Sequence, residues 1–177
     1  MSRVPEGMEV LIGAADIQRR VKELGQEIGA SFAGGDLVLV GVLKGSFLFL
    51  ADLCRHIDLP LRCDFLGVSS YGDHTKTSGI IRITSDLSRS ISGKDVLLVE
   101  DIVDTGLTMR YLLDNLSTRR PRRLQVCSLL DKPARRRVEV PIDFLGFTVP
   151  DVFVVGYGLD YRGLYRNLDF IGKLRDA

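Results

Sequence analysis

The sequence predicts an α/β fold in which helices flank a central, mostly parallel sheet. Residues 96–99 are four consecutive apolar residues, the pattern of a strand that is buried on both faces, as in a parallel sheet. After them, Met109, Leu112, Leu113 and Leu116 recur at helical spacing. A chain of 177 residues with 45% hydrophobic content suits one globular domain, which we place over residues 1–177.

The first half of the chain alternates helical and strand patterns. An opening amphipathic helix is predicted from Ala14 to Ile28, because apolar residues recur there at helical spacing and Gly34-Gly35 follows as a stop. Residues 37–43 form an apolar run that predicts a buried strand. A second helix face then follows, made of Phe47, Leu50, Ala51 and Cys54.

The second half continues with strands and one long polar stretch. Residues 61–70, 80–83, 124–130 and 152–155 have strand patterns. Residues 71–79 have no apolar face, and we expect a mobile loop there. No Pro/Gly/Ser-rich linker, internal repeat or low-complexity tract divides the chain.

The most informative segment is the loop between the strand at 96–99 and the helix after it. Glu100, Asp101 and Asp104 cluster there, and the turn that follows is made of Thr105, Gly106, Leu107 and Thr108. Ligands of open α/β sheets bind at the carboxyl ends of the strands, and a helix N-terminus offers free N–H groups to an anion. This turn can therefore cradle a phosphate. The Walker and Rossmann glycine patterns, two other phosphate-binding motifs, are absent.

Residues 99–108, Val-Glu-Asp-Ile-Val-Asp-Thr-Gly-Leu-Thr, resemble the loop of type I phosphoribosyltransferases that binds phosphoribosyl diphosphate (PRPP). The resemblance extends from residue 37 to residue 174 and is strongest to the hypoxanthine-guanine branch in its compact bacterial form. It implies the type I phosphoribosyltransferase fold. In that fold a small base-binding hood, formed here by the N-terminal and C-terminal segments, and a flexible lid loop accompany the central sheet.

Two further segments match loops of that family. Lys44-Gly45 follows a buried strand and corresponds to the loop that binds pyrophosphate through backbone groups, often with an unusual peptide geometry. Glycine permits such close backbone approach. Ser70-Tyr71 begins the polar stretch and resembles the lid over the reaction centre. A lid suits glycosyl transfer, because water must be kept from a reactive, cation-like sugar.

The purine site is implied by residues 131–133 and 150–162. In the resembling enzymes the lysine corresponding to Lys132 donates to the oxygen at carbon 6 of a purine, Phe153 stacks on the base, and the backbone of Val154 meets its exocyclic edge. Asp160 matches a magnesium ligand and Arg166 the arginine that binds pyrophosphate. The connection between Tyr161 and Arg166 departs slightly from the family pattern.

The resemblance implies transfer of the phosphoribosyl group from PRPP to hypoxanthine or guanine in purine salvage. Mg²⁺ is the implied cofactor, held near Glu100, Asp101 and Asp160, and it would neutralise the leaving pyrophosphate. Glu100 and Asp101 would also hold the ribose hydroxyls. Asp104 would take the proton from nitrogen 7 of the purine.

Two alternatives remain. The same fold can act on xanthine, adenine, orotate or uracil, although Lys132 disfavours adenine and the segment around Phe153 disfavours pyrimidines. A regulator on this fold could instead bind RNA through the arginines at 119–123 and 135–137, because clustered arginines contact phosphates. At a net charge of +1, solvated surface arginines are the better interpretation, and we do not expect a nucleic-acid partner.

Composition and termini predict a cytoplasmic protein. The three cysteines lack zinc-site spacing, so we expect reduced, buried thiols. The N-terminus has no apolar signal core, and Lys44 and Asp52 interrupt the longest apolar stretches, so no membrane association is predicted. The family resemblance implies a homo-oligomer, either a dimer or a tetramer.

Overall fold

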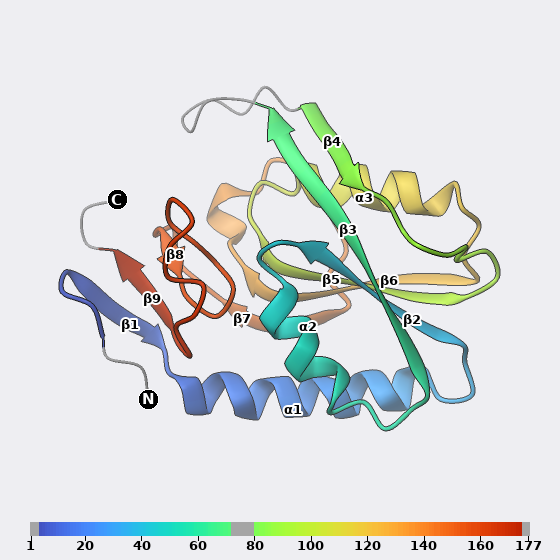
Figure 1. The fold of residues 1–177 in the computed structure, drawn as a ribbon, viewed down its shortest axis with the longest axis horizontal. Helices are drawn as coiled ribbons and strands as arrows, with labels where there is room; N and C mark the ends of the chain where they lie inside the picture. Colours follow the sequence, from blue (N-terminus) through green and yellow to red (C-terminus); the bar gives the residue numbers. More distant parts are fainter. Residues whose placement is uncertain (1–3, 72–79, 175–177) are drawn as a thin grey trace.

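The computed structural model describes residues 4–71 and 80–174. Within these residues, six strands form the central sheet, which is parallel except for its antiparallel edge strand β4 (Figure 1). This confirms the predicted α/β class. In spatial order the strands are β4 (Ile80–Ser85), β3 (Leu61–Tyr71), β2 (Leu37–Leu43), β5 (Asp95–Val103), β6 (Arg123–Asp131) and β7 (Phe144–Thr148).

Helices cover both faces of this sheet. Helices α1 (Ala14–Ser31) and α2 (Phe47–Cys54) pack on one face, and α3 (Leu107–Ser117) packs on the other (Figure 1). Along β2, Leu37 and Leu39 belong to the core beneath α1 and α2, whereas Val38 and Val40 belong to the core beneath α3. Because both faces are buried, β2 and residues 96–99 of β5 are continuous apolar runs. None of the helices in the described part of the chain is long and apolar enough to cross a membrane.

A second sheet joins the two ends of the described chain. Its three strands are antiparallel neighbours in the order β1 (Met8–Ile12), β9 (Ile171–Leu174) and β8 (Val154–Val155). Met8, Val155, Leu168 and Phe170 form a separate apolar cluster there.

This small sheet corrects two predicted elements. The chain does not open with a helix, because β1 precedes α1; the apolar run of β1 is only three residues long, Val10 to Ile12, which is too short to predict a strand. The strand expected over 152–155 is shortened to Val154–Val155, because a turn in which the Val152 N–H donates to the Pro150 carbonyl (2.9 Å) occupies the preceding residues. Strand β7 was also missed, since Gly146 interrupts its short apolar run.

The cysteines do not share one environment. Cys127 is buried in the core, and this burial raises the pKa of its thiol. Cys54 is half-buried at the end of α2, and Cys63 on β3 is exposed, so the expectation that all three are buried was wrong. All three are free thiols.

The strand order places a switch point beside β2. From β2 the chain proceeds through α2 to β3 on one side, and later enters β5 on the other side. The carboxyl ends of β2 and β5 therefore flank the position where the direction of winding reverses. Open α/β sheets bind their ligands in the crevice at such a point.

Candidate active site

The loop between β5 and α3 is built around Gly106. This residue has φ +84°, and a Cβ atom added to it would lie 2.2 Å from the Val138 carbonyl oxygen. Any side chain at position 106 would thus be strained and would collide with the backbone. Thr105, Gly106 and Thr108 line a cavity of about 110 Å³, whereas Leu107 begins α3 and does not line it.

The segment after β6 braces this loop. The Arg137 and Val138 N–H groups both donate to the Thr105 carbonyl, at 2.9 and 3.1 Å. Arg136 donates to the Asp104 carbonyl at 3.1 Å and forms an ion pair with Asp131. Two of the three residues 135–137 therefore support the loop. This role was missed in the sequence, because arginine runs are common on solvated surfaces.

Glu100 and Asp101 lie toward the carboxyl end of β5, in the wall of the cavity beside this loop and of a neighbouring one. Desolvation raises the pKa of both carboxyls, and the Asp101 charge raises that of Glu100 further. Asp101 accepts a hydrogen bond from the Ile102 N–H (2.8 Å), but Glu100 Oε2 accepts none from any described residue. A buried oxygen without a partner costs free energy, so a ligand hydroxyl or a metal-bound water would stabilise it.

The loop after β2 packs against Asp101. The Leu43–Lys44 peptide bond is cis, in agreement with the unusual geometry implied for this loop. A Cβ atom at Gly45 would lie 1.5 Å from Asp101 Oδ2, and one at Gly158 would lie 2.0 Å from the Gly45 carbonyl oxygen. Both glycines are therefore needed for the close approach of β2, β5 and the C-terminal segment. The Lys44 side chain is exposed.

Asp160 and Arg166 extend the same cavity from the C-terminal segment. Arg166 donates to the Gly158 carbonyl (2.6 Å), and its Nη2 lies 2.6 Å from Asp160 Oδ1. Asp160 Oδ2 accepts a hydrogen bond from the Gly163 N–H (2.6 Å). The cavity, about 270 Å³, brings together seven predicted residues: Lys44, Gly45, Glu100, Asp101, Thr108, Asp160 and Arg166.

Five lining residues of this cavity were not among the predicted site residues. Val42 and Leu43 end β2, Val68 and Ser69 lie near the end of β3, and Ile81 lies on β4, where it pairs with Ser70. The position of Ser69 toward the carboxyl end of a strand beside β2 is the signal that could have identified it.

The predicted base-binding residues lie directly after β6 and at the start of β8. Lys132 is buried, and its Nζ donates to the Val152 carbonyl (2.7 Å) and lies 4.0 Å from Asp151. An ammonium group carries three donors, so others remain for a ligand. Phe153 is 43% exposed, and its ring meets the Tyr161 ring edge-on with centroids 5.5 Å apart. Val154 is buried in β8.

Asp104 follows the last residue of β5, beside Arg135. Its Oδ1 lies 3.4 Å from Arg135 Nε and accepts no hydrogen bond within the described residues. Both side chains are partly exposed, at 36% and 48%, and ion pairs of this kind contribute little to stability. Arg135 can therefore be displaced from Asp104 at small cost.

Ser70 and Tyr71 end β3, where their backbones pair with Ile81 and Ile80 of β4. Most of the expected lid loop, residues 72–79, lies outside the described residues. The lid thus stays a prediction.

The arginines at 119–123 are largely engaged within the protein. Arg119 lies 2.6 Å from Asp86, and Arg122 forms an ion pair with the buried Asp95. Arg123 donates to the Ser31 carbonyl (3.1 Å) and stacks over a phenylalanine ring. These contacts favour a structural role over a free RNA-binding surface.

The predicted metal ligands do not form a cage. Among residues 4–71 and 80–174, no group of three or more His, Cys, Asp or Glu side chains is arranged to hold a metal ion. Glu100, Asp101 and Asp160 nevertheless line one cavity, and Glu100 Oε2 lacks a partner in the described structure. Mg²⁺ binds through one or two carboxylates together with waters and substrate phosphates. The donor set therefore fits a Mg²⁺ ion that arrives with a phosphorylated substrate.

Comparison with known proteins identifies relatives of this chain. The phosphoribosyl transferase domain family matches residues 13–162. The chain is 53% identical over 171 residues to the hypoxanthine-guanine phosphoribosyltransferase of Mycobacterium avium, covering 93% of this chain and 84% of the relative. It is 50% identical over 169 residues to the hypoxanthine phosphoribosyltransferase of Escherichia coli K12, and the match covers 94% of this chain and 95% of the relative.

A solved structure supports the same relationship. The hypoxanthine phosphoribosyltransferase of Trypanosoma cruzi, in complex with its product IMP, superposes with a TM-score of 0.91 at 44% identity. The match covers 99% of this chain and 98% of that one. Sequence and fold agree over nearly the whole chain, which therefore belongs to the phosphoribosyltransferase family, in the branch of the hypoxanthine-guanine enzymes.

Proposed function

We propose that the protein transfers the phosphoribosyl group of PRPP to hypoxanthine or guanine, forming IMP or GMP and pyrophosphate in purine salvage. One observation carries the proposal. The β5–α3 loop, the Glu100–Asp101 pair, Gly45 and Arg166 meet at the switch point of the sheet. A phosphate cradle, a pair of carboxylates and a second anion site are thus adjacent, as a substrate with phosphates at both ends of a ribose requires.

PRPP would lie across the two cavities. Its 5′-phosphate would occupy the turn Thr105–Thr108, where the helix N-terminus favours an anion. Its ribose hydroxyls would donate to Glu100 and Asp101. Its pyrophosphate would meet Lys44, Gly45 and Arg166, whose guanidinium matches the geometry of phosphate oxygens.

Mg²⁺ would be held by Asp160 and, directly or through water, by Glu100 and Asp101. When bound, it neutralises the charge that develops on the leaving pyrophosphate. The Asp160–Arg166 ion pair supplies one carboxylate and one guanidinium at the same end of the cavity. This pair would orient the leaving group between opposite charges.

The purine would stack on Phe153, which is open to solvent on much of its surface. Lys132 would donate to the oxygen at carbon 6, and the Val154 backbone would bind the neighbouring edge of the ring. Asp104 would accept the proton from nitrogen 7 as nitrogen 9 attacks the anomeric carbon; its Oδ1, which accepts no hydrogen bond within the described residues, supports this role. The adjacent carboxylates would also stabilise the cation-like sugar.

We further propose that Ser70 and Tyr71 close over the site as a lid, which would exclude water from the reacting sugar. The protein would act as a homo-oligomer in the cytoplasm, and its free cysteines agree with that compartment. Phe47 and Phe65 are 39% and 37% exposed, and their burial would favour self-association.

The experiment is an assay of nucleotide and pyrophosphate formation by the purified chain with PRPP and Mg²⁺. Hypoxanthine, guanine, xanthine, adenine and uracil are compared as acceptors. We expect rapid, equimolar products with hypoxanthine or guanine, and little with adenine, because its amino group opposes the Lys132 donor. Turnover only with xanthine would revise the substrate, and turnover with none of the bases would refute the function.

A further inference from the structure

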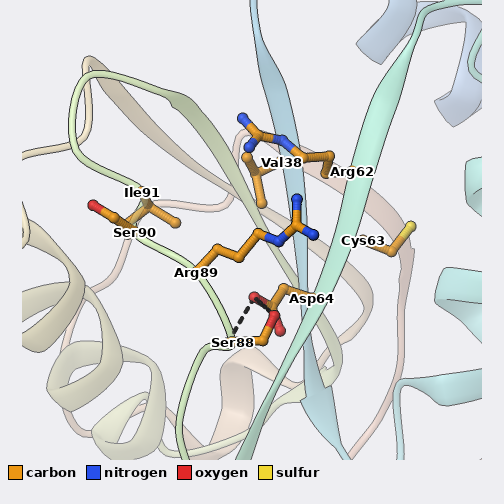
Figure 2. Close-up of a pocket in the computed structure, with 8 residues that line it drawn as sticks. All are labelled: Val38, Arg62, Cys63, Asp64, Ser88, Arg89, Ser90 and Ile91. Carbon is orange, nitrogen blue, oxygen red and sulfur yellow. Dashed lines mark hydrogen bonds between the residues drawn. The ribbon is translucent and has the colours of Figure 1, made fainter.

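A second pocket lies at the opposite edge of the sheet from the candidate active site. On one side it is lined by the first residues of β2 and β3, and on the other side by the loop that joins β4 to β5 (Figure 2). Its volume is about 250 Å³. Val38, in its lining, is the second residue of β2, whereas Lys44 follows the last residue of that strand. Six residues of extended chain separate them by roughly 20 Å. The two sites are therefore distinct.

Two guanidinium groups enter this pocket. Arg62 comes from β3 and Arg89 from the β4–β5 loop, and both extend into the space between the loop and the strands (Figure 2). Arg62 lies 2.7 Å from the half-exposed Asp36 at the rim. Arg89 makes no hydrogen bond or ion pair with any residue in the described parts of the chain. Its charge is thus uncompensated beside a second cation.

The carboxylate in the pocket is already engaged. Asp64 Oδ2 accepts hydrogen bonds from the backbone N–H and the hydroxyl of Ser88, both at 2.9 Å, and its Oδ1 accepts one from the Phe65 N–H. These bonds hold the loop directly before Arg89. Asp64 therefore positions the loop, which leaves Arg89 and those N–H donors of Arg62 that do not bind Asp36 to bind a ligand.

The pocket floor is apolar. Val38 is 4% and Ile91 is 2% exposed, and Ile91 belongs to the core beneath α3. A ligand that satisfies both guanidiniums and this floor needs an anionic head and a small carbon body. Phosphate oxygens match the guanidinium fork bidentately, and a phosphomonoester carries nearly two negative charges at neutral pH, which suits two guanidinium groups better than the single charge of a carboxylate.

We propose that this pocket is a second ligand site, which binds a small phosphomonoester between Arg62 and Arg89 with its carbon part on Val38 and Ile91. The proposal is independent of the transfer reaction. The volume accommodates a phosphate and a ring-sized carbon group but not a larger nucleotide conjugate.

The test is a site-resolved NMR titration of the whole ¹⁵N-labelled chain with inorganic phosphate and, separately, with phenyl phosphate. We expect saturable shifts of the Ser88 to Ile91 amides, with phenyl phosphate binding more tightly because it also covers the apolar floor. Arg89→Gln should weaken this binding about tenfold, the loss expected for a charge-assisted contact. Lys22→Gln, an exposed charge removed from α1 on the other face, should leave it unchanged.

Several outcomes would overturn the proposal. If phosphate and phenyl phosphate bind equally at residues 88–91, the site takes free phosphate and not a monoester. If only the Gly106 region responds, the anions bind the candidate active site alone. If Arg89→Gln binds phenyl phosphate as tightly as the wild type, Arg89 does not contact the ligand, and the proposed binding geometry is wrong.

Discussion

Replacing Gly45 with alanine puts a methyl group where the Asp101 carboxylate lies. The added carbon would be 1.5 Å from Asp101 Oδ2 and 2.4 Å from its Cγ, although real Cβ atoms essentially never approach another heavy atom within 3.0 Å. Gly45 does not have a positive φ. The effect of the substitution is therefore steric and not a matter of backbone conformation.

Neither side of this contact can retreat freely. Gly158 packs so closely on the Gly45 carbonyl that its own Cβ would lie 2.0 Å away, and Asp101 is held by the Ile102 N–H. The distance between the added Cβ atom and Asp101 Oδ2 must nevertheless increase by about 1.5 Å to reach 3.0 Å. Overpacking of this kind costs about 1–3 kcal/mol of folding free energy, and a displacement of about 1 Å in a catalytic site can cost on the order of 100-fold in rate.

The assay compares kcat/KM for PRPP and the free energy of unfolding in Gly45→Ala and the wild type. We expect kcat/KM to fall about 100-fold, more than the loss of stability alone explains, because Gly45 and Asp101 both face the proposed pyrophosphate and ribose. Gly29→Ala in α1 is the matched control: its methyl group would make only an ordinary contact, 3.9 Å from the Asp58 backbone nitrogen, and it should stabilise the helix by about 1 kcal/mol. Unchanged PRPP kinetics in Gly45→Ala would refute this packing argument.

Three further predictions concern catalysis, base binding and acid stability. Asp104→Asn should lower turnover by about 10²- to 10⁴-fold and leave the PRPP Kd nearly unchanged; equal turnover would exclude Asp104 as the base. Phe153→Ala should raise KM for the purine about tenfold through lost stacking, with little change in Tm because the ring is 43% exposed; an unaltered KM would exclude stacking there. A hydrogen bond from Arg122 holds the pKa of the buried Asp95 carboxyl below its usual range. Asp95 thus stabilises the fold above the unfolded-state pKa of about 3.9, and this contribution is lost as the pH falls through the lower folded-state pKa. In acid titrations Asp95→Asn should flatten the fall of unfolding free energy below about pH 4; an identical slope would contradict this linkage.

The central sheet and the β5–α3 loop could be predicted from sequence for a physical reason. Strand segments buried on both faces must be apolar throughout, so β2 and residues 96–99 of β5 stand out as uninterrupted runs. Polar residues directly after such runs then have to lie at the carboxyl edge of the sheet. This reasoning, together with the family resemblance, identified Lys44 and Asp101 as neighbours in one site.

Other features depend on contacts that no local pattern reveals. Gly158 packs against Gly45, although the two residues are more than a hundred positions apart in the sequence. A glycine in a sequence does not show which distant segment will pack against it. The half-exposed β1 offers an apolar run of only three residues, Val10 to Ile12, which is too short to predict a strand. Arg136 braces the β5–α3 loop through a backbone carbonyl and Asp131, although its local sequence is that of a solvated basic run.

The most direct measurement is the calorimetric titration of PRPP into the wild type and into Arg166→Gln, with and without Mg²⁺. If the cavity at the switch point binds PRPP, the wild type will show one site per chain that Mg²⁺ strengthens, and Arg166→Gln will weaken it about tenfold or more through the lost contact to pyrophosphate. Lys22→Gln serves as the charge control. Equal affinity for PRPP in the wild type and in Arg166→Gln would contradict the assignment of this cavity as the PRPP site.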